Sequence, residues 1–274
     1  MNTEFSVLMS IYVNDSAENL EQSIYSVTHQ SLLPKEIILV QDGQLTENLN
    51  KKITFLLKKF SILKLVALPK NVGLGYALLE GTKYVTTNLI ARMDADDISV
   101  TNRFEKQLRE FNINPEISIV GGQVAEFENN VSNVVSYRYV PLHDSEIRQF
   151  AKFRSPFNHP TVMIKKDILI KVGGYLPFDY LEDYYLWIRL LSEDNVYVSN
   201  ISDILVYMRV DQGMYGRRGG LKYLKSYVRL KKISHKNNFI NYREYLLTIV
   251  PMLCSTIMPI KLRKILYKLV LRKK

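Results

Sequence analysis

The feature that most constrains the fold is an alternation of apolar runs and amphipathic segments that continues to about residue 112. Four segments are largely apolar, as in strands that are buried on both faces. They are FSVLMSIYV (Phe5–Val13), EIILVQDG (Glu36–Gly43), LKLVALP and NLIARMD. Helical patterns such as ENLNKKITFLLKKF and GLGYALLEGTKYV separate them. Strands that alternate with helices over short turns predict a doubly wound, parallel α/β sheet.

Beyond Ile117–Gly122 the pattern becomes irregular. AEFENNVSNVVSYRYVP predicts β structure, HDSEIRQFAKF a short helix, and PTVMIKKDILIKVGGY a strand that runs into a helix. DYYLWIRLLSED predicts a helix with Trp187 in the core, and DILVYMRV a final strand. After Gly220 the chain is helical, basic and increasingly apolar.

Charge is distributed unevenly along the chain. Of 37 Lys and Arg residues, 16 lie between Arg217 and Lys274, where Glu244 is the only acid. That segment carries a net charge of +15, and the preceding 216 residues carry −5. A mildly acidic domain with a basic tail predicts a polyanionic partner, either nucleic acid or anionic lipid.

Cysteine usage and the N-terminus indicate a reducing compartment. Cys254 is the only cysteine, which excludes a disulfide framework within the chain and a cysteine-based metal site. The N-terminal MNTEFSVLMSIYV has no basic region before its apolar run and carries Glu4, so we do not expect a signal peptide.

Polar side chains fall where three of the predicted strands end. Tyr12 follows the first strand, Asp42 the second, and Asp94 and Asp96 the fourth. Ligands of open α/β sheets bind beyond the carboxyl ends of the strands, so these side chains should converge on one crevice. Alternate carboxylates there could hold Mg²⁺ or Mn²⁺. Alternatively, Asp96 and Asp97 begin a loop or cap a helix.

Three further features have two interpretations each. Glu182 and Asp183 open a predicted helix, where they could supply a general base or simply favour the helix dipole. His159 in FNHP could bind a metal or the acceptor, or be a hydrogen-bonded structural residue. Arg217 and Arg218 in GRRGG could bind a diphosphate, or form a solvated basic turn.

The ordered motifs resemble those of family 2 glycosyltransferases of the GT-A fold. They are SVLMSIY, SVTHQSLLPKEIILVQDG, NVGLGYALLEG, LIARMDADD, NHPTVMIKK, GGY and EDYYLWIRL, and the likeness covers about residues 5 to 210. LPKNVGLGYALLEG, IARMDADD, FNHPTVM and RRGG are most similar to bacterial enzymes of O-antigen or exopolysaccharide synthesis. Such enzymes add a β1,3-linked galactose or glucose to GlcNAc-diphospho-undecaprenol.

The resemblance implies an architecture. We expect a Rossmann-like, mostly parallel twisted sheet with flanking helices, which makes up a catalytic domain of residues 1–215. Residues 1–122 would bind the nucleotide sugar and residues 123–215 the acceptor. Residues 216–274 would form a basic, apolar, helical tail that associates with the membrane.

The resemblance also implies residue roles in an inverting transfer from a UDP-hexose donor. Donor binding would fall on Tyr12, Asp42, Lys70, Asn71, Arg92, Asp94, Asp96, Arg217 and Arg218. Asp96 would bind Mn²⁺ or Mg²⁺, and Asp94 would contact the ribose or a metal-bound water. Asp183 would be the catalytic base, with Glu182 beside it, and His159 is a further candidate metal ligand.

The chain departs from the family pattern in three places. Ser10 replaces a common Pro after the first strand, and the turn after the second strand has one Asp instead of two. Leu78–Leu79 replaces the Arg-Asn pair often found in the helix after the Gly-rich turn. A basic group is therefore missing there, and Lys70, Arg92 or Arg217–Arg218 would substitute for it.

The C-terminal segment predicts contact with a membrane surface. Tyr245–Ile260 is 16 residues without a charge, too short for a spanning helix and interrupted by two prolines. KLRKILYKLVLRKK then has one apolar face bordered by Lys and Arg, as in an interfacial helix on an anionic membrane or a helix docked on the protein's own core. We expect peripheral attachment to the cytoplasmic face of the bacterial inner membrane and a lipid-diphosphate-linked sugar acceptor.

Other functions fit the sequence less well. A nucleotidyltransferase would need a basic loop after the first strand, where YVNDSAEN is acidic. A nucleic-acid-binding module would interleave aromatic and basic residues, whereas the basic groups of the tail border a continuous apolar face. We therefore expect no nucleic acid partner. A glycosyltransferase of the same fold with another donor or acceptor, for capsule or protein glycans, stays open.

Overall fold

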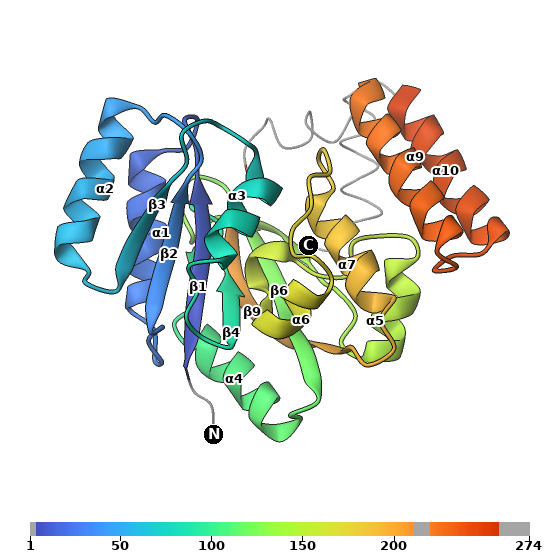
Figure 1. Ribbon diagram of the computed structural model, residues 1–274, viewed down its shortest axis with the longest axis horizontal. Coiled ribbons are helices and arrows are strands. Elements are labelled where there is room, and N and C mark those ends of the chain that lie inside the picture. The colour runs from blue at the N-terminus through green and yellow to red at the C-terminus, as the bar shows by residue number, and fades with distance from the viewer. Residues whose placement is uncertain (1–3, 211–219, 258–274) are drawn as a thin grey trace.

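The computed structural model describes residues 4–210 and 220–257, and its N-terminal half has the predicted alternation of strands and helices (Figure 1). Four strands lie parallel in the order β3-β2-β1-β4. The strands are β1 (Phe5–Ile11), β2 (Glu36–Gln41), β3 (Leu63–Ala67) and β4 (Leu89–Arg92). The helices are α1 (Ala17–Thr28), α2 (Glu47–Lys59), α3 (Leu74–Thr82) and α4 (Arg103–Ile113).

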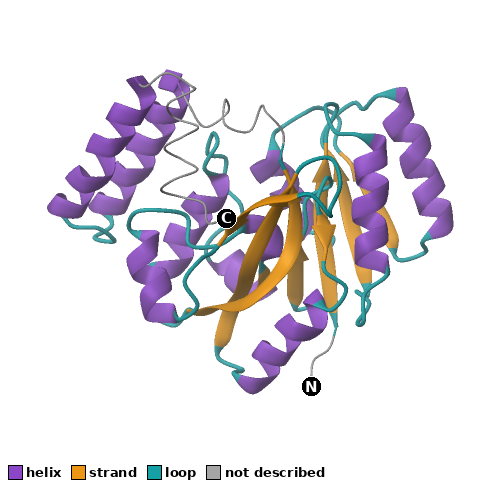
Figure 2. Cartoon of the chain, turned by 180° about the vertical axis from the view of Figure 1, so that it is seen from behind, coloured by secondary structure: helices purple, strands orange, loops and turns teal. Residues whose placement is uncertain are grey.

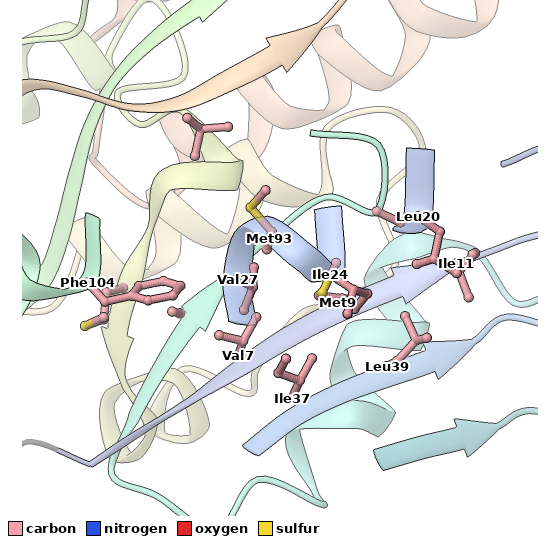
Figure 3. Packing of buried hydrophobic residues seen from close by; sticks show 14 of the residues in the cluster. Val7, Met9, Ile11, Leu20, Ile24, Val27, Ile37, Leu39, Met93 and Phe104 are labelled. Atoms are coloured by element: carbon pink, nitrogen blue, oxygen red, sulfur yellow. The ribbon is translucent and has the colours of Figure 1, made fainter. Parts of the chain in front are cut away.

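Apolar residues on both faces of these strands explain why they are central. Val7 and Met9 of β1 pack with Ile24 and Val27 of α1 on one face (Figure 3). On the other face, Leu8 packs with residues of α3. Each such side chain contributes roughly 1.5–3 kcal/mol when it is fully buried. The continuous apolar runs of the sequence are therefore strands covered by helices on both sides.

Side-chain hydroxyl groups cap the N-termini of the first two helices. The hydroxyl of Ser16 accepts the backbone N–H groups of Glu18 and Asn19 at the start of α1. Thr46 likewise accepts the N–H of Leu49 at the start of α2. Such caps each stabilise a helix by about 1 kcal/mol. They begin each helix a few residues after the strand end, which leaves the carboxyl ends of β1 and β2 uncovered.

The C-terminal half corrects the prediction of a mostly parallel sheet. Its strands are β5 (Ile98–Ser99), β6 (Ile117–Phe127), β7 (Val134–Arg138), β8 (Met163–Lys165) and β9 (Tyr197–Arg209). The complete order is β3-β2-β1-β4-β8-β6-β9-β5, with β7 paired to β6. Strand β8 is antiparallel to both β4 and β6, and β6 is parallel to β9. The sheet is therefore mixed.

The reversal at β8 follows from its connection. A parallel neighbour needs a crossover that returns the chain to the starting end of the sheet. The chain instead enters β8 from a 3₁₀ turn, His159–Thr161, beside the carboxyl end of β4, where the N–H of Arg92 donates to the carbonyl of Val162 at 2.8 Å. Strand β8 must then run back along β4. The sequence predicts this strand, but no local pattern in it indicates that the strand runs antiparallel to β4.

Helices α5 (Asp144–Ala151), α6 (Lys166–Lys171) and α7 (Glu182–Leu191) cover the second half of the sheet (Figure 2). The pair α9 (Gly220–Lys236) and α10 (Tyr242–Ile257) lies farther from the strands. Trp187 of α7 is completely buried, as predicted. Tyr184 and Ile188 of α7 pack with Tyr227 and Leu230 of α9, so α9 is docked on the catalytic fold.

The structure describes only part of the C-terminal segment for which the sequence predicts contact with a membrane. None of the helices described between residues 4 and 257 is long and apolar enough to cross a membrane. Residues 216–219 of the GRRGG motif and the segment KLRKILYKLVLRKK lie outside the described residues, whereas Gly220 begins α9.

Gly81 of α3 provides a test of the packing between helix and sheet. A Cβ at this position would lie 2.5 Å from Cγ2 of Val40 and 2.6 Å from Cδ1 of Leu8. Gly and Val differ little in helix propensity, so overpacking decides the effect of Gly81→Val. We expect a loss of roughly 1–3 kcal/mol in the free energy of unfolding, measured by urea denaturation. Glu80→Ala, on the neighbouring position with a 29% exposed side chain, is the control. An unchanged midpoint for Gly81→Val would contradict this packing.

Candidate active site

The carboxyl ends of β1, β2 and β4 meet at one edge of the sheet, as the sequence predicts. The N–H of Asp42 donates to the carbonyl of Ile11 at 2.8 Å, which places the ends of β1 and β2 side by side. Tyr12 is half-buried there, and its N–H donates to the Asp15 carboxylate at 2.9 Å. The N–H of Met93 donates to the carbonyl of Leu8, which joins the end of β4 to the same edge.

Asp42 holds the Gly-rich turn that precedes α3. Its buried carboxylate accepts the N–H groups of Val72 at 2.7 Å and Gly73 at 3.0 Å, and the side-chain amide of Asn71 at 3.0 Å. These bonds use most of the acceptor capacity of a carboxylate. Asp42 therefore fixes Asn71 beside the strand ends, with Lys70 exposed next to it. Contact of Asp42 with uracil or ribose stays a prediction.

Three carboxylates crowd the end of β4. One oxygen from each of Asp94, Asp96 and Asp97 lies within 4.8 Å of the others. The side chain of Asp94 is 34% exposed, whereas Asp97 is almost completely buried. Burial, followed by the charge of Asp94, raises the pKa of Asp96 to about 6. The same two causes raise the pKa of Asp97 well above its usual range. The crowded carboxylates therefore carry an unfavourable electrostatic cost.

Two arginines offset part of that repulsion. Nη2 of the buried Arg92 lies 2.5 Å from Oδ1 of Asp94. The backbone N–H of Arg209, at the end of β9, donates to Oδ1 of Asp97 at 2.9 Å, and Nε of Arg209 donates to the carbonyl of Asp96 at 3.1 Å. Arg209 was not among the predicted site residues. Its position at the end of the last strand is the only signal in the sequence that could have indicated it.

The donor set fits a hard divalent cation. Mg²⁺ and Mn²⁺ prefer carboxylate oxygens, and the cluster offers three carboxylates. Within the described segments, Oδ2 of Asp97 is buried without a hydrogen-bond partner. Asp97, which the sequence suggested only as a loop or cap residue, thus joins Asp94 and Asp96 as a candidate ligand.

His159 lies outside this carboxylate cluster. The cluster of candidate ligand atoms among the described residues does not include it. Its Nε2 shares a hydrogen bond of 2.9 Å with the hydroxyl of Tyr175, and its ring stands at an angle to that of Trp187. Burial, together with the charge of Arg92, lowers the pKa of His159 well below its usual range. A neutral, hydrogen-bonded imidazole agrees with the interpretation of His159 as a structural residue. Its role as a metal ligand stays a prediction.

The candidates for the missing basic group differ in position. Arg92 is buried beneath Asp94, Lys70 is exposed at the turn after β3, and Arg217–Arg218 lies outside the described residues. In the part of the chain that the structure describes, Nε and Nη1 of Arg92 have no hydrogen-bond partner. Arg92 therefore contributes positive charge beneath the carboxylates.

One cavity joins the two acidic clusters. It has a volume of about 520 Å³, and both Asp94 and Asp183 line it. Asp183 stands in the first turn of α7, where its Oδ1 accepts the N–H of Tyr184 at 2.7 Å. Glu182 lies instead toward α3, where a Cβ on Gly75 would be 3.3 Å from Cβ of Glu182. Burial, followed by the charge of Asp183, raises the pKa of Glu182 to about 7.

The opposite wall of the cavity comes from parts of the chain to which the sequence assigned no site residue. Helices α9 and α10 contribute Tyr223, Tyr227, Leu247, Thr248, Pro251 and Met252. The segment around α5 contributes Phe150, Phe153 and Arg154, and β7 contributes Arg138. No local motif marks these positions, because they come together only when the helical pair docks on α7.

A buried lysine supports this wall from behind. Lys231 of α9 is completely buried, and its Nζ donates to the hydroxyl of Tyr184 at 2.5 Å and to the carbonyl of Lys152 at 2.7 Å. Burial lowers the pKa of Lys231 to about 7. The contacts join α9, α7 and the end of α5.

Comparison with known proteins identifies the fold and the chemistry. The family model "Glycosyl transferase family 2" matches residues 6–173. An uncharacterized glycosyltransferase of Haemophilus influenzae is 43% identical over 98% of this chain and its own whole length. The amylovoran biosynthesis glycosyltransferase AmsE of Erwinia amylovora is 38% identical over 96% of this chain and 98% of its own.

A third relative has a stated activity. The UDP-Gal:α-D-GlcNAc-diphosphoundecaprenol β-1,3-galactosyltransferase of Escherichia coli is 36% identical over 98% of this chain and 97% of its own. Among solved structures, S. aureus TarS in complex with UDP-GlcNAc superposes with a TM-score of 0.65 at 16% identity, over 91% of this chain and 71% of that one. A mannosyltransferase from Pyrobaculum calidifontis, in complex with GDP-Man and Mn²⁺, gives 0.63 at 14% identity, over 85% and 64%. The chain therefore belongs to glycosyltransferase family 2 and is a glycosyltransferase with a GT-A-like fold.

Proposed function

We propose that this enzyme transfers galactose or glucose from a UDP-hexose to GlcNAc-diphospho-undecaprenol, with inversion and a β1,3 link, in O-antigen or exopolysaccharide synthesis. The main support is that Asp94, at the donor end of the sheet, and Asp183, at the start of α7, line one cavity. The activity named for the E. coli relative supports the donor, the acceptor and the link.

The carboxylate cluster would hold the metal. Asp96 and Asp94, with Asp97, would bind Mn²⁺ or Mg²⁺, which offsets the charge that develops on the leaving diphosphate. Tyr12, Asn71 and the turn held by Asp42 would then enclose the nucleoside at the same strand ends. Arg92, whose Nη2 lies 2.5 Å from Oδ1 of Asp94, would orient that carboxylate toward the donor.

Asp183 would act as the base. A carboxylate within about 3 Å of the acceptor hydroxyl can take its proton as the hydroxyl attacks the anomeric carbon. Attack from the side opposite UDP inverts that carbon in one displacement. Glu182, with its pKa near 7, carries a proton for part of the time at neutral pH, which reduces the repulsion on the neighbouring Asp183.

Helix α10 would bring the enzyme to its lipid-linked acceptor. Its outer surface exposes Leu246, Leu247, Val250 and Leu253, each more than 40% exposed. The partner helix α9 carries exposed lysines, among them Lys222 and Lys225. An apolar strip beside basic groups suits an anionic membrane surface. We propose peripheral binding at the cytoplasmic face of the bacterial inner membrane.

A donor and metal assay tests the proposal. We expect a product one hexose heavier than a synthetic GlcNAc-diphospho-lipid with UDP-galactose or UDP-glucose and Mn²⁺, detected by mass spectrometry. EDTA should abolish it, and added Mn²⁺ should restore it. Product that is equally abundant in EDTA would exclude the metal role of the carboxylates, and no product with either donor would exclude the proposed substrates.

Substitutions separate the base from the metal ligands. Asp183→Asn should lower kcat by roughly 10²–10⁴-fold, because it removes the proton acceptor, and leave the Kd for UDP and Mn²⁺ unchanged. Asp96→Asn should weaken UDP binding in the presence of Mn²⁺, measured by calorimetry. Asp194→Asn, at an exposed position beyond the end of α7, is the matched control. Loss of UDP binding in Asp183→Asn would assign Asp183 to the donor site instead.

The raised pKa of Glu182 predicts a pH-dependent stability. The pKa is about 7 in the folded chain against a usual 4.5, so the folded state binds this proton more tightly. The contribution is greatest below pH 4.5 and is lost as the pH rises through about 7. Glu182→Gln should therefore gain in Tm relative to wild type between pH 5 and pH 8, by roughly 2–5 °C at pH 8. Parallel Tm profiles for the two proteins would contradict the shift.

A further inference from the structure

The segment between α5 and the 3₁₀ turn brings an amide side chain to the cavity that Asp94 and Asp183 also line. It is Asn158 of the motif FNHP, to which the sequence assigned no role. The residue is only 6% exposed, so protein surrounds almost all of its surface. A polar side chain that is buried to this extent needs hydrogen-bond partners for its N–H groups and for its oxygen.

The amide nitrogen of Asn158 is fully used within the protein. Nδ2 donates to the carbonyl of Gly122 on β6 at 3.0 Å and to the carbonyl of Arg138 on β7 at 3.2 Å. Both neighbours are carbonyl oxygens, which can only accept, so the nitrogen of the amide must face them and not its oxygen. These two bonds fix the orientation of the side chain.

The amide oxygen has no such partner. In residues 4–210 and 220–257, no group donates a hydrogen bond to Oδ1 of Asn158. This oxygen is also not among the partnerless atoms that the described chain closes off from solvent, in contrast to Oδ2 of Asp97. Because Asn158 lines the cavity, Oδ1 is accessible there. A fixed acceptor that faces a cavity suits a ligand group that donates a hydrogen bond.

The rings on either side of Asn158 tie its segment to the helix that carries the proposed base. Those of Phe157 and His159 stand edge-on to the ring of Trp187, with centroid distances of 5.1 and 5.9 Å. Trp187 follows Asp183 by four residues, so the two share one face of α7. These contacts fix the segment of Asn158 against the helix whose first turn carries Asp183.

The acceptor sugar is the ligand that must reach Asp183. If Asp183 takes the proton of the 3-hydroxyl of GlcNAc, the 2-acetamido group lies on the neighbouring carbon of the same sugar. Its N–H donates in a fixed direction, because the amide is planar and its nitrogen accepts no hydrogen bond. A hydroxyl can instead rotate toward water or another partner. The acetamido N–H is therefore the group of this sugar that a fixed oxygen recognises best.

We infer that Oδ1 of Asn158 accepts a hydrogen bond from the acetamido N–H of the acceptor GlcNAc, so that Asn158 selects a 2-acetamido sugar as acceptor. This inference rests on the proposed function for the identity of the acceptor and of the attacked hydroxyl. A sugar without a donor at this position would leave Oδ1 unpaired when it fills the cavity, which lowers its affinity. Asn158 is a binding residue and takes no part in proton transfer.

A pair of acceptors that differ in one group tests the inference. One is GlcNAc-diphospho-lipid with a short hydrocarbon chain, and the other carries a 2-O-acetyl ester in place of the 2-acetamido group. The ester keeps the acyl carbonyl and the methyl group and lacks only the N–H. Binding of each acceptor is measured by calorimetry to full-length enzyme saturated with UDP and Mn²⁺, so that the nucleotide site is occupied.

Two variants remove the oxygen. Asn158→Ala does so completely, but it also takes a donor from the carbonyls of Gly122 and Arg138. Asn158→Ser leaves a hydroxyl that can donate to one of these carbonyls, while its oxygen lies one bond farther from the ligand. It gives the same test if Asn158→Ala does not fold.

Thr161→Val is the matched control. The buried hydroxyl of Thr161 donates to the backbone carbonyl of Asn158 at 2.7 Å and accepts the N–H of Gly122 at 3.1 Å. Thr161 is not one of the described residues that line the cavity. The control therefore disturbs the same segment without removing an atom from the cavity.

We expect wild type to bind the acetamido acceptor roughly 5- to 30-fold more tightly than the ester, as for one hydrogen bond whose loss leaves an acceptor unpaired. Both Asn158 variants should bind the two acceptors within about twofold of each other. Thr161→Val should keep the wild-type ratio even where its affinity for both falls. Because the ratio compares two ligands on one protein, it cancels damage that weakens both alike.

Three results would overturn the inference. They are equal binding of the two acceptors by wild type, an unchanged ratio in the folded Asn158 variants, and a weaker Kd for UDP-hexose but not for UDP in those variants. The last result would place Asn158 on the hexose of the donor. Failure of the proposed function differs from all three, since wild type would then bind neither acceptor and form no product from the acetamido acceptor with either UDP-hexose.

Discussion

The end of β4 is the constraint around which the site is arranged. Three carboxylates gather where a buried strand leaves the sheet, and burial together with their mutual repulsion raises the pKa values of Asp96 and Asp97. Such a cluster is tolerated only beside compensating charge. Arg92 supplies it from the same strand, and the charge of Arg209, at the end of β9, acts on Asp96. The mixed sheet thus brings a cation from the C-terminal half to the acids of the N-terminal half.

The reversal of the sheet at β8 explains how two halves form one cavity. The parallel strands β1, β2 and β4 direct their carboxyl ends toward one edge, as in other open α/β sheets. Strand β8 runs back from that edge, so the chain returns there only through the segments that lead to α7. Asp183 then faces the same space as Asp94.

The α9–α10 pair completes the site rather than standing apart from it. Tyr227 and Leu230 of α9 pack on α7, and Lys231 bonds to the hydroxyl of Tyr184. The same pair carries the basic and apolar surface that we propose lies on the membrane. A helix that contacts both α7 and a membrane surface would place the opening of the cavity where a lipid-linked acceptor lies.

The sequence by itself determined the parallel half, the strand-end acids and the family. Continuous apolar runs, caps such as Ser16 and Thr46, and the order of the motifs are local properties, and local properties can be recognised along a chain. The position of Asp183 at a helix start was equally visible. Only the tertiary structure decided the direction of β8, the burial of Asp97 and the cavity wall that contains Arg154 and is supported from behind by Lys231. These depend on contacts between residues far apart in the chain, such as Arg209 with Asp97 and Lys231 with Tyr184, and no periodicity or local motif encodes such pairs.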